Sequence, residues 1–127
     1  MTAGHAIALS FLLSAAALQP SPAPFDTERA AALIRPTLPR AYSGGLVFRE
    51  VSVEDGVLVA LVSGPRAAFD EIGRTELARL FAEGFCRQDG GRSTFAVGFR
   101  MRLDTRDDGG TEISRGLVVD HCPQPAQ

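Results

Sequence analysis

The chain has 127 residues, of which 45% are apolar and 22% charged, and its formal net charge is −2. This length suits one domain, and the composition is that of a globular protein rather than a disordered one. The nearly balanced charge excludes the basic surface that binds nucleic acid and the polybasic signal that binds membranes. We therefore expect one globular domain with no nucleic-acid partner.

The chain starts with an apolar segment, AIALSFLLSAAAL, that carries no charge from residue 6 to residue 18. It is too short to span a bilayer, which takes about 20 residues, but it fits the apolar part of an export signal. With the small residues of 15–17 as a cleavage pattern, we predict a signal peptide over 1–17 that is cleaved after Ala17. Residues 1–5 contain no Lys or Arg, so a buried N-terminal helix is the alternative.

A proline-rich stretch follows, and we predict an extended spacer over 18–25 because alternate prolines block helix formation. The folded domain is expected over 26–122, with an unstructured tail at 123–127. No cysteine follows the apolar segment directly, so a lipid anchor is not supported. After cleavage the protein would have no stable membrane anchor and would be periplasmic or secreted.

Asp26 is placed to cap a short helix that should end by Ile34, because Pro36 disfavours helical geometry at the residue before it. Two strands are expected at 46–53 and 57–63. The Asp55-Gly56 pair between them is a strong hairpin signal. Because the second strand is apolar throughout, we expect it to be central or covered on both faces.

A long amphipathic helix is expected over 70–86. Five residues fall on one face at helical spacing: Leu77, Leu80, Phe81, Gly84 and Phe85. This face could form a recognition groove, but packing in the core is the interpretation that we favour.

Residues 95–104 alternate between apolar and polar, which predicts a strand with one buried face, and 111–119 is its expected partner. Pairing Leu103 with Ile113 leaves 107–109 as a three-residue hairpin loop with Gly109 in the left-handed conformation. Phe99 would then lie opposite Leu117, Val97 opposite Val119, and Arg102 diagonal to Glu112.

The same register places Arg115 opposite Met101 on the buried face. Three explanations are open: the side chain reaches the rim of the sheet, the register differs, or Arg115 anchors an anionic ligand. His121 follows nearby, so Arg115 and His121 are the candidate ligand-binding residues.

The acidic loop is not a good calcium site. With Gly109 at position 6 of an EF-hand loop, Asp104 and Asp108 fit positions 1 and 5. However, Arg106 and Arg115 would occupy ligand positions 3 and 12. A turn explains the stretch, although a weak site made by Asp107, Asp108 and Glu112 is an alternative.

Cys86 and Cys122 are the only cysteines. In an exported protein we expect them to form a disulfide, which would stabilise the fold by about 3–4 kcal/mol. A metal site made by Cys86, His121 and Cys122 is the alternative, but no zinc-type spacing is present. We therefore expect no metal.

The sequence contains no P-loop, dinucleotide fingerprint or Gly-x-Ser-x-Gly elbow. His121 is the only histidine after the signal, and a Cys–His nucleophile would need a reduced cysteine beside it. We expect no catalytic residue and no cofactor, and a small hydrolase is the least favoured function.

The expected fold is α+β: a four-stranded, mostly antiparallel sheet made of two hairpins, with one long helix on one face and a short N-terminal helix. Such a domain resembles small periplasmic adaptors such as the C-terminal domains of TonB and TolA, but none of their motifs is present. We predict an exported, non-catalytic domain that binds a protein partner, in association with the cell envelope. A small anionic-ligand-binding protein is the alternative.

Overall fold

The structure is a computed structural model that describes residues 25–124. The predicted signal peptide, nearly all of the predicted spacer and residues 125–127 of the predicted tail lie outside the described residues. Cleavage after Ala17 therefore stays a prediction.

The first part of the fold contains one helix and a β-hairpin. Helix α2 (Thr27–Ile34) is followed by the 3-10 turns η1 (Arg35–Thr37) and η2 (Ser43–Gly45) and by strands β1 (Arg40–Ala41), β2 (Val47–Glu54) and β3 (Val57–Gly64). The cap is confirmed, since Asp26 accepts a hydrogen bond of 3.0 Å from the backbone N–H of Arg29. The hairpin is also confirmed: Asp55 (φ 50°) and Gly56 (φ 76°) both have the positive φ of a type I′ turn.

Three helices connect β3 to β4 (Met101–Asp107), namely α3 (Arg66–Ile72), α4 (Arg74–Arg87) and α5 (Gly91–Ala96). The single helix predicted over 70–86 is wrong in its first part, because Gly73 adopts φ 85° and separates α3 from α4. A side chain other than glycine would rarely adopt this conformation.

The strand predicted over 95–104 begins later than expected, because Phe95 and Ala96 belong to α5. Phe95 and Phe99 are spaced at i and i+4 as well as at a period of two, so the pattern does not distinguish a strand from a helical turn. Their rings pack in the core with centroids 5.0 Å apart. Val97, expected inside, is 47% exposed.

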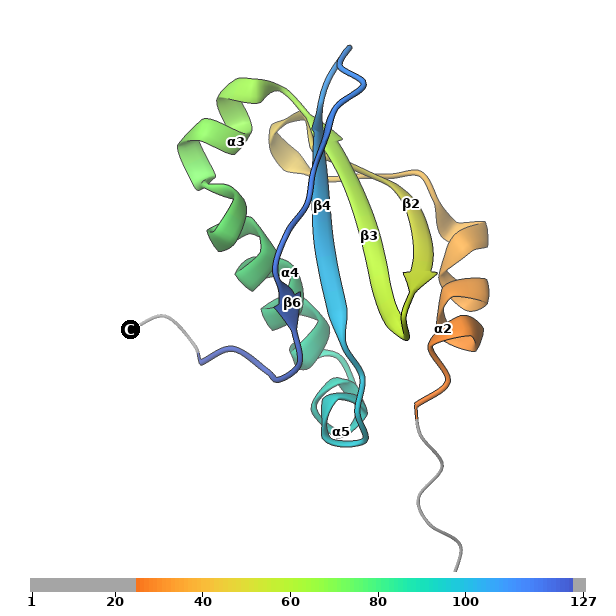
Figure 1. Cartoon of the computed structure of the whole chain (residues 1–127). Helices are drawn as coiled ribbons and strands as arrows, with labels where there is room; N and C mark the ends of the chain where they lie inside the picture. Colours follow the sequence, from red (N-terminus) through yellow and green to blue (C-terminus); the bar gives the residue numbers. More distant parts are fainter. Residues whose placement is uncertain (1–24, 125–127) are drawn as a thin grey trace, which may run out of the picture.

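The sheet has the order β1-β2-β3-β4-β5, with β5 at Ile113–Ser114. A sixth strand, β6 (Val118–Val119), pairs with the same edge of β4, at Met101 and Arg102. Only the β3–β4 pair among these is parallel, so the α+β class and the mostly antiparallel sheet are confirmed (Figure 1). The described part of the chain has six strands rather than the expected four, because β1 is added at one margin and the strand expected over 111–119 is divided into β5 and β6. The parallel pairing of β3 with β4 supplies the strand order that the sequence left open.

The predicted pairing of Leu103 with Ile113 is wrong. Ile113 pairs with Arg106 and is 50% exposed, and Val119 pairs with Met101. Gly109 does have a positive φ of 74°, but the connection is longer than three residues and moves the returning strand out of the expected register. Arg102 consequently contacts Glu54 instead of Glu112.

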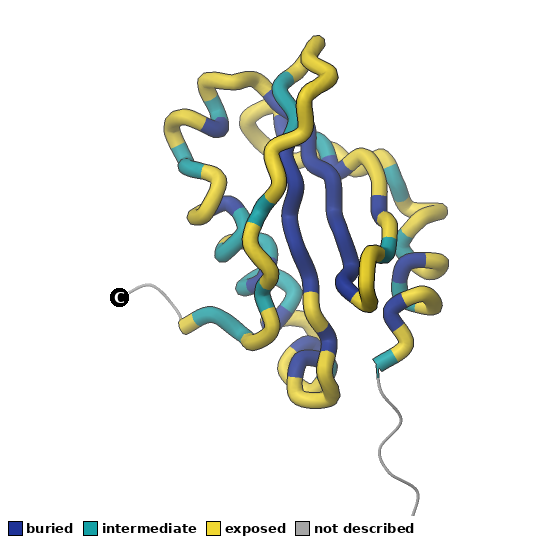
Figure 2. Tube along the Cα trace, in the orientation of Figure 1, coloured by how far each residue is buried: buried dark blue, intermediate teal, exposed yellow. Residues whose placement is uncertain are grey.

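The core lies on both sides of β3, in which every residue is buried, as its apolar sequence predicted (Figure 2). Leu58, Ala60 and Val62 face the helices and belong to one apolar cluster with residues of α2, α4 and β4. Val59 and Leu61 point to the opposite face, which no described helix covers. We call the two faces the helix side and the outer side.

Candidate functional site

The helix side of the sheet contains an apolar groove of about 650 Å³ between α4 and the α2–β1 region. Its volume lies within the range of small-molecule ligand pockets, which is about 300–1,000 Å³. We call it the helix-side groove. Its lining is mostly apolar and includes Leu46, Phe48, Leu58, Ala60, Ile72, Leu77, Leu80, Phe81, Phe85, Phe99 and Met101.

Two pairs of aromatic rings line the groove. Tyr42 packs edge-on against Phe81 with ring centroids 5.4 Å apart. Phe25 packs against Phe99 with centroids 4.9 Å apart. Leu80 is 44% exposed at the rim, so part of the apolar face of α4 remains open to solvent.

Gly84 is the glycine among the described residues that line the groove. It lies inside α4, where glycine costs about 0.5–1 kcal/mol relative to alanine. A Cβ at this position would meet no atom within 4 Å, so the packing of the domain itself does not require a glycine. The missing side chain leaves room in the groove, where Gly84 is one of the lining residues.

Charge is scarce in the helix-side groove. Among the described lining residues, Arg40 is the one that carries a charge, and its guanidinium donates a hydrogen bond of 2.7 Å to Thr37 Oγ1. The groove is therefore suited to an apolar surface rather than to a charged small molecule.

The two residues predicted to bind a ligand, Arg115 and His121, do come together. Both line a smaller cleft of about 380 Å³ between α4 and the segment 115–123, which we call the C-terminal cleft. Arg115 does not lie on the buried face, because its side chain is 71% exposed. The reason is that Val119, and not Arg115, pairs with Met101.

The bases of the C-terminal cleft are paired with acids. Arg115 Nη2 lies 3.5 Å from Glu54 Oε2, and His121 Nδ1 lies 2.7 Å from Asp120 Oδ1. The hydrogen bond from His121 lowers the pKa of the Asp120 carboxyl. These acids reduce the positive charge that the cleft can offer to an anionic ligand.

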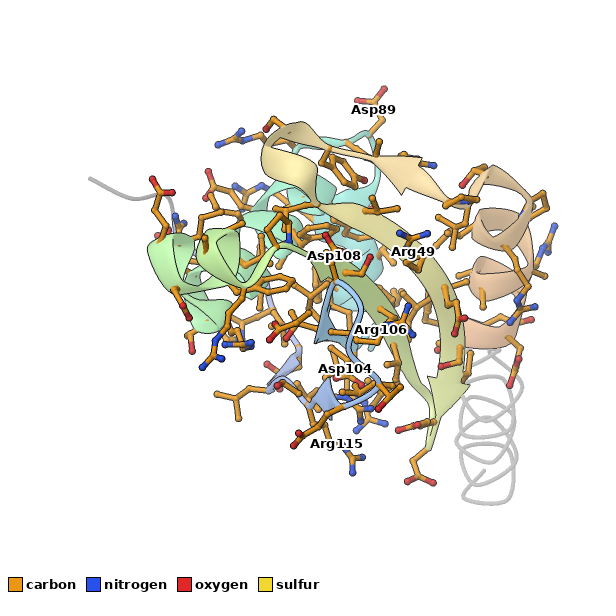
Figure 3. All side chains as sticks on the ribbon, turned by 90° about the horizontal axis from the view of Figure 1, so that it is seen from above. Arg49, Asp89, Asp104, Arg106, Asp108 and Arg115 are labelled. Carbon is orange, nitrogen blue, oxygen red and sulfur yellow. A yellow bond between two sulfur atoms is a disulfide. The ribbon has the colours of Figure 1, made fainter. Side chains whose placement is uncertain are left out.

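The outer side of the sheet carries an ion-pair network that the sequence did not indicate. Arg102 and Asp104 are only 5% and 6% exposed, and Arg102 Nε donates to Asp104 Oδ1 at 2.8 Å. Arg102 also donates to Glu54 at 2.9 Å, and the Gly116 N–H donates to Asp104 at 3.1 Å. In Figure 3, Asp104 and Arg115 lie on the blue C-terminal part of the chain, on the side of the sheet away from β1.

This network favours the ionised carboxylate of Asp104. Burial raises the pKa of Asp104, but the hydrogen bonds from Arg102 and Gly116 outweigh it, so the pKa lies below its usual value. The hydrogen bonds that Arg102 donates to Asp104 and Glu54 raise the pKa of its guanidinium. The network therefore holds the backbone of Gly116, between β5 and β6, against β4.

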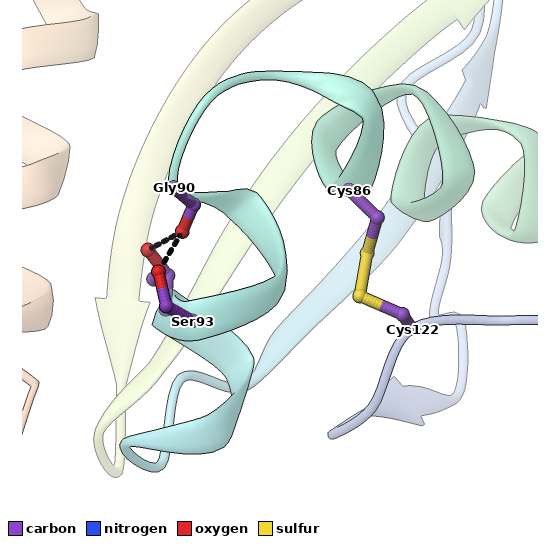
Figure 4. Close-up of a disulfide and its surroundings, with 5 residues drawn as sticks. Cys86, Gly90, Ser93 and Cys122 are labelled. Atoms are coloured by element: carbon purple, nitrogen blue, oxygen red, sulfur yellow. Dashed lines mark hydrogen bonds between the residues drawn. A yellow bond between two sulfur atoms is a disulfide. The ribbon is translucent and has the colours of Figure 1, made fainter.

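Cys86 and Cys122 are joined by a disulfide, with their Cα atoms 6.0 Å apart (Figure 4). The bond connects the end of α4 to the C-terminal segment. Neither cysteine is a thiol in this structure, so the Cys–His nucleophile considered from the sequence has no free cysteine.

Within residues 25–124, no group of three or more His, Cys, Asp or Glu side chains is placed to hold a metal ion. None of the helices described is both long and apolar enough to cross a membrane.

Sequence reasoning found the apolar face of α4 but assigned it to the core. All three of Leu77, Leu80 and Phe81 line the groove, but Leu77 is buried whereas Leu80 is 44% exposed at the rim. The signal that could have separated the two roles is Gly84, a helix-weakening residue in the middle of the apolar face.

No family profile and no curated protein matches the sequence. Solved structures do resemble the fold. The pilotin EpsS of the Vibrio vulnificus type 2 secretion system aligns with a TM-score of 0.62 and 18% identity, over 77% of this chain and 90% of that one.

Two further structures align in a similar way. The type II secretion system pilotin AspS from Vibrio cholerae has a TM-score of 0.59 and 17% identity, over 73% of this chain and 84% of that one. A candidate secreted protein from Pseudomonas aeruginosa has a TM-score of 0.56 and 16% identity, over 70% of this chain and 83% of that one. At these identities the similarity shows a common fold: the described domain has the fold of these secretion pilotins.

Proposed function

We propose that this protein is an exported, non-catalytic module that binds a protein partner of the cell envelope in the helix-side groove. The observation that carries the proposal is the groove itself, which is open, apolar and about 650 Å³ in volume. Its walls are mostly apolar, and Leu80 at its rim is 44% exposed, so the groove offers an apolar surface to a partner.

The sequence and the fold support export. The predicted signal peptide over 1–17 would direct the chain out of the cytoplasm, and a disulfide is stable in an oxidising compartment. The fold is shared with two pilotins and a candidate secreted protein. These points support a periplasmic or secreted protein that acts in a secretion or envelope assembly.

The nature of the groove supports an apolar peptide segment as the occupant. Its walls offer aromatic and aliphatic contacts, and Gly84 permits a partner backbone to approach α4 closely. Arg40 at the margin can pair with an acidic residue of the partner. Recognition of this kind places most of the binding energy in a few buried apolar anchors.

The test is photo-crosslinking or affinity capture from the native envelope fraction, with the processed protein and two matched variants. Leu80→Asp puts a charge on the groove wall, where the side chain is already 44% exposed, whereas Leu117→Asp puts it at a 76% exposed site outside the groove. We expect Leu80→Asp to lose the captured partner at least tenfold and Leu117→Asp to retain it. Both variants should unfold at nearly the temperature of the original protein.

Equal capture by both variants, or no partner above background, would contradict the proposal. Gly84→Leu gives a second variant that fills the groove without adding charge, and it should weaken capture in the same way.

A small anionic ligand in the C-terminal cleft is the second candidate, favoured by the placement of Arg115 and His121 in one hollow. Thermal unfolding with added carboxylates or phosphate tests it. Stabilisation of the original protein that disappears in Arg115→Ala would support this candidate, and its absence would leave the cleft without a ligand of this class.

A further inference from the structure

The two margins of the sheet are protected to different degrees. At the β2 margin, β1 pairs with the start of the strand, and Arg35 Nη2 donates a hydrogen bond of 3.4 Å to the carbonyl of Val51. At the other margin, β6 pairs with β4 on one side, and no strand within residues 25–124 pairs with its second side (Figure 1). An exposed sheet edge of this kind is a template for the addition of another strand.

The direction of the backbone groups of β6 follows from the strands beside it. The N–H of Leu58 in β3 donates to the carbonyl of Arg100 at 3.0 Å, so the backbone of Arg100 faces β3 and that of Met101 faces β6. Successive residues of a strand direct their backbone polar groups to opposite sides. Val119 pairs with Met101 and is turned toward β4, whereas the N–H and C=O of Val118 are directed to the open side.

The open side of β6 is bordered by the C-terminal cleft, which lies between this edge and α4 and has a volume of about 380 Å³. Leu117 and Val118 line the cleft and are 76% and 50% exposed, so the edge offers apolar side chains as well as backbone groups. Alternate side chains of an added strand would point into the cleft, and those between them toward the outer side of the sheet.

The edge is held in place before any partner arrives. The Gly116 N–H donates to Asp104 Oδ1 at 3.1 Å, and Cys122 is bonded to Cys86 at the end of α4. A strand that binds here does not have to order the edge, which removes part of the entropic cost of binding.

Arg115 gives the edge a preference for acidic residues. Its side chain is 71% exposed, and its contact with Glu54 on the outer side is long, at 3.5 Å. Exposed ion pairs of this kind are weak, so a carboxylate of a partner can replace Glu54. The other arginines of the cleft, Arg74 and Arg79, each have an acid of this chain within 3.3 Å and are less available.

We propose that the open edge at Val118 binds an extended segment of a partner protein by strand addition. Apolar side chains of the segment lie in the C-terminal cleft, and the acidic side chains that alternate with them are directed toward Arg115. This site is distinct from the helix-side groove and does not depend on the function proposed above. It differs from a site for a small anion because main-chain hydrogen bonds supply most of the binding.

The probe is a fluorescein-labelled hexapeptide of alternating Glu and Val, and the matched control is the same peptide with Lys in place of Glu. Fluorescence anisotropy with the full chain should show saturable binding of the Glu peptide and about tenfold weaker binding of the Lys peptide. Arg115→Glu should reverse this preference. The absence of saturable binding, or equal binding of the two peptides, would overturn the proposal.

Val118→Pro tests the backbone contact. Proline has no N–H and is tolerated on the open side of an edge strand, so this variant should unfold at nearly the temperature of the original protein and bind the Glu peptide about tenfold more weakly. Hydrogen exchange in the original protein tests the same contact without a substitution, since the Val118 N–H should exchange quickly and slow when the peptide is added. Binding retained by Val118→Pro, or a Val118 N–H that exchanges equally with and without peptide, would contradict strand addition.

Two controls separate this site from the others. Leu80→Asp, in the helix-side groove, should bind the Glu peptide as the original protein does, so failure here does not count against the proposed function. Loss of the peptide in Leu80→Asp would place it in the groove and overturn the edge site. Displacement of the peptide by an equal concentration of acetate would show a simple anion site and would likewise overturn strand addition.

Discussion

The two faces of the sheet are buried in different ways. On the helix side, apolar side chains of the strands pack against α2, α4 and α5, and a groove remains between the helices. On the outer side, no described helix covers the strands, yet Arg102 and Asp104 are almost completely buried by their own neighbours. The first face is held by non-directional contacts and the second by specific ion pairs.

This difference determines which face of the sheet can tolerate changes in its side chains. A buried ion pair fails when one partner is removed, because the other charge is left without compensation. The groove has no such requirement, since its rim residues are already partly exposed. We infer that the outer side fixes the fold and that the helix side is free to adapt to an occupant.

The largest effect should follow from breaking the outer network. Arg102→Ala leaves Asp104 buried with only the Gly116 N–H as a hydrogen-bond donor, and should lower the free energy of unfolding by about 3–5 kcal/mol. The matched control is Arg115→Ala, whose exposed pair with Glu54 should contribute well under about 1 kcal/mol. Urea unfolding measures both. A similar loss for the two variants would show that burial does not distinguish these pairs.

A slightly smaller effect is expected from the disulfide, which ties α4 on the helix side to the C-terminal segment. Its closed loop has a sequence separation of 36, for which the chain-entropy relation gives about 3–4 kcal/mol. Cys86→Ser with Cys122→Ser should lower the unfolding temperature accordingly. Thiol labelling of the exported protein is the companion measurement. Labelling of either cysteine without prior reduction would show that the disulfide is not formed.

Acid should weaken the outer side selectively. The pKa of Asp104 is lowered in the folded protein, so its contribution to stability is present above the unfolded value of about 3.9 and is lost as the pH falls below it. Asp104→Asn should unfold more easily at neutral pH and should show a flatter decline between about pH 5 and pH 2. If the free energy of unfolding falls equally with pH in the two proteins, Asp104 is not the group responsible for the loss of stability in acid.

The smallest change is expected in the groove and has the opposite sign. Gly84→Ala should stabilise the domain by about 0.5–1 kcal/mol, because alanine favours the helix and its methyl group meets no atom. The same variant should bind the occupant of the groove more weakly. A loss of stability on calorimetry would mean that Gly84 is needed by the fold itself.

Features that depend on a few adjacent residues were predictable from the sequence. The Asp26 cap and the Asp55-Gly56 turn each involve only local hydrogen bonds or dihedral angles. The register of 111–119 was not predictable, because it depends on the packing of Gly116 against the backbone of Leu103. Alternation along one strand contains no information about that contact.

The candidate site was predictable only in part. The helical spacing of Leu77 and Phe81 correctly indicated an apolar face. Whether that face is covered depends on how far α2 and β1 extend toward α4, which the sequence of α4 does not encode. Arg115 and His121 both line the C-terminal cleft, but the acid that pairs with Arg115 is Glu54, 61 positions away in the sequence, which no local pattern indicates.

The parallel pairing of β3 with β4 has a consequence for the time course of folding. Leu58 pairs with Met101, and all of α3, α4 and α5 lies between them in the chain. The β2–β3 hairpin can close locally, but the centre of the sheet cannot form until the crossover has returned. Such long-range closure has a high entropic cost before its contacts form, so we expect the docking of β4 to limit the folding rate.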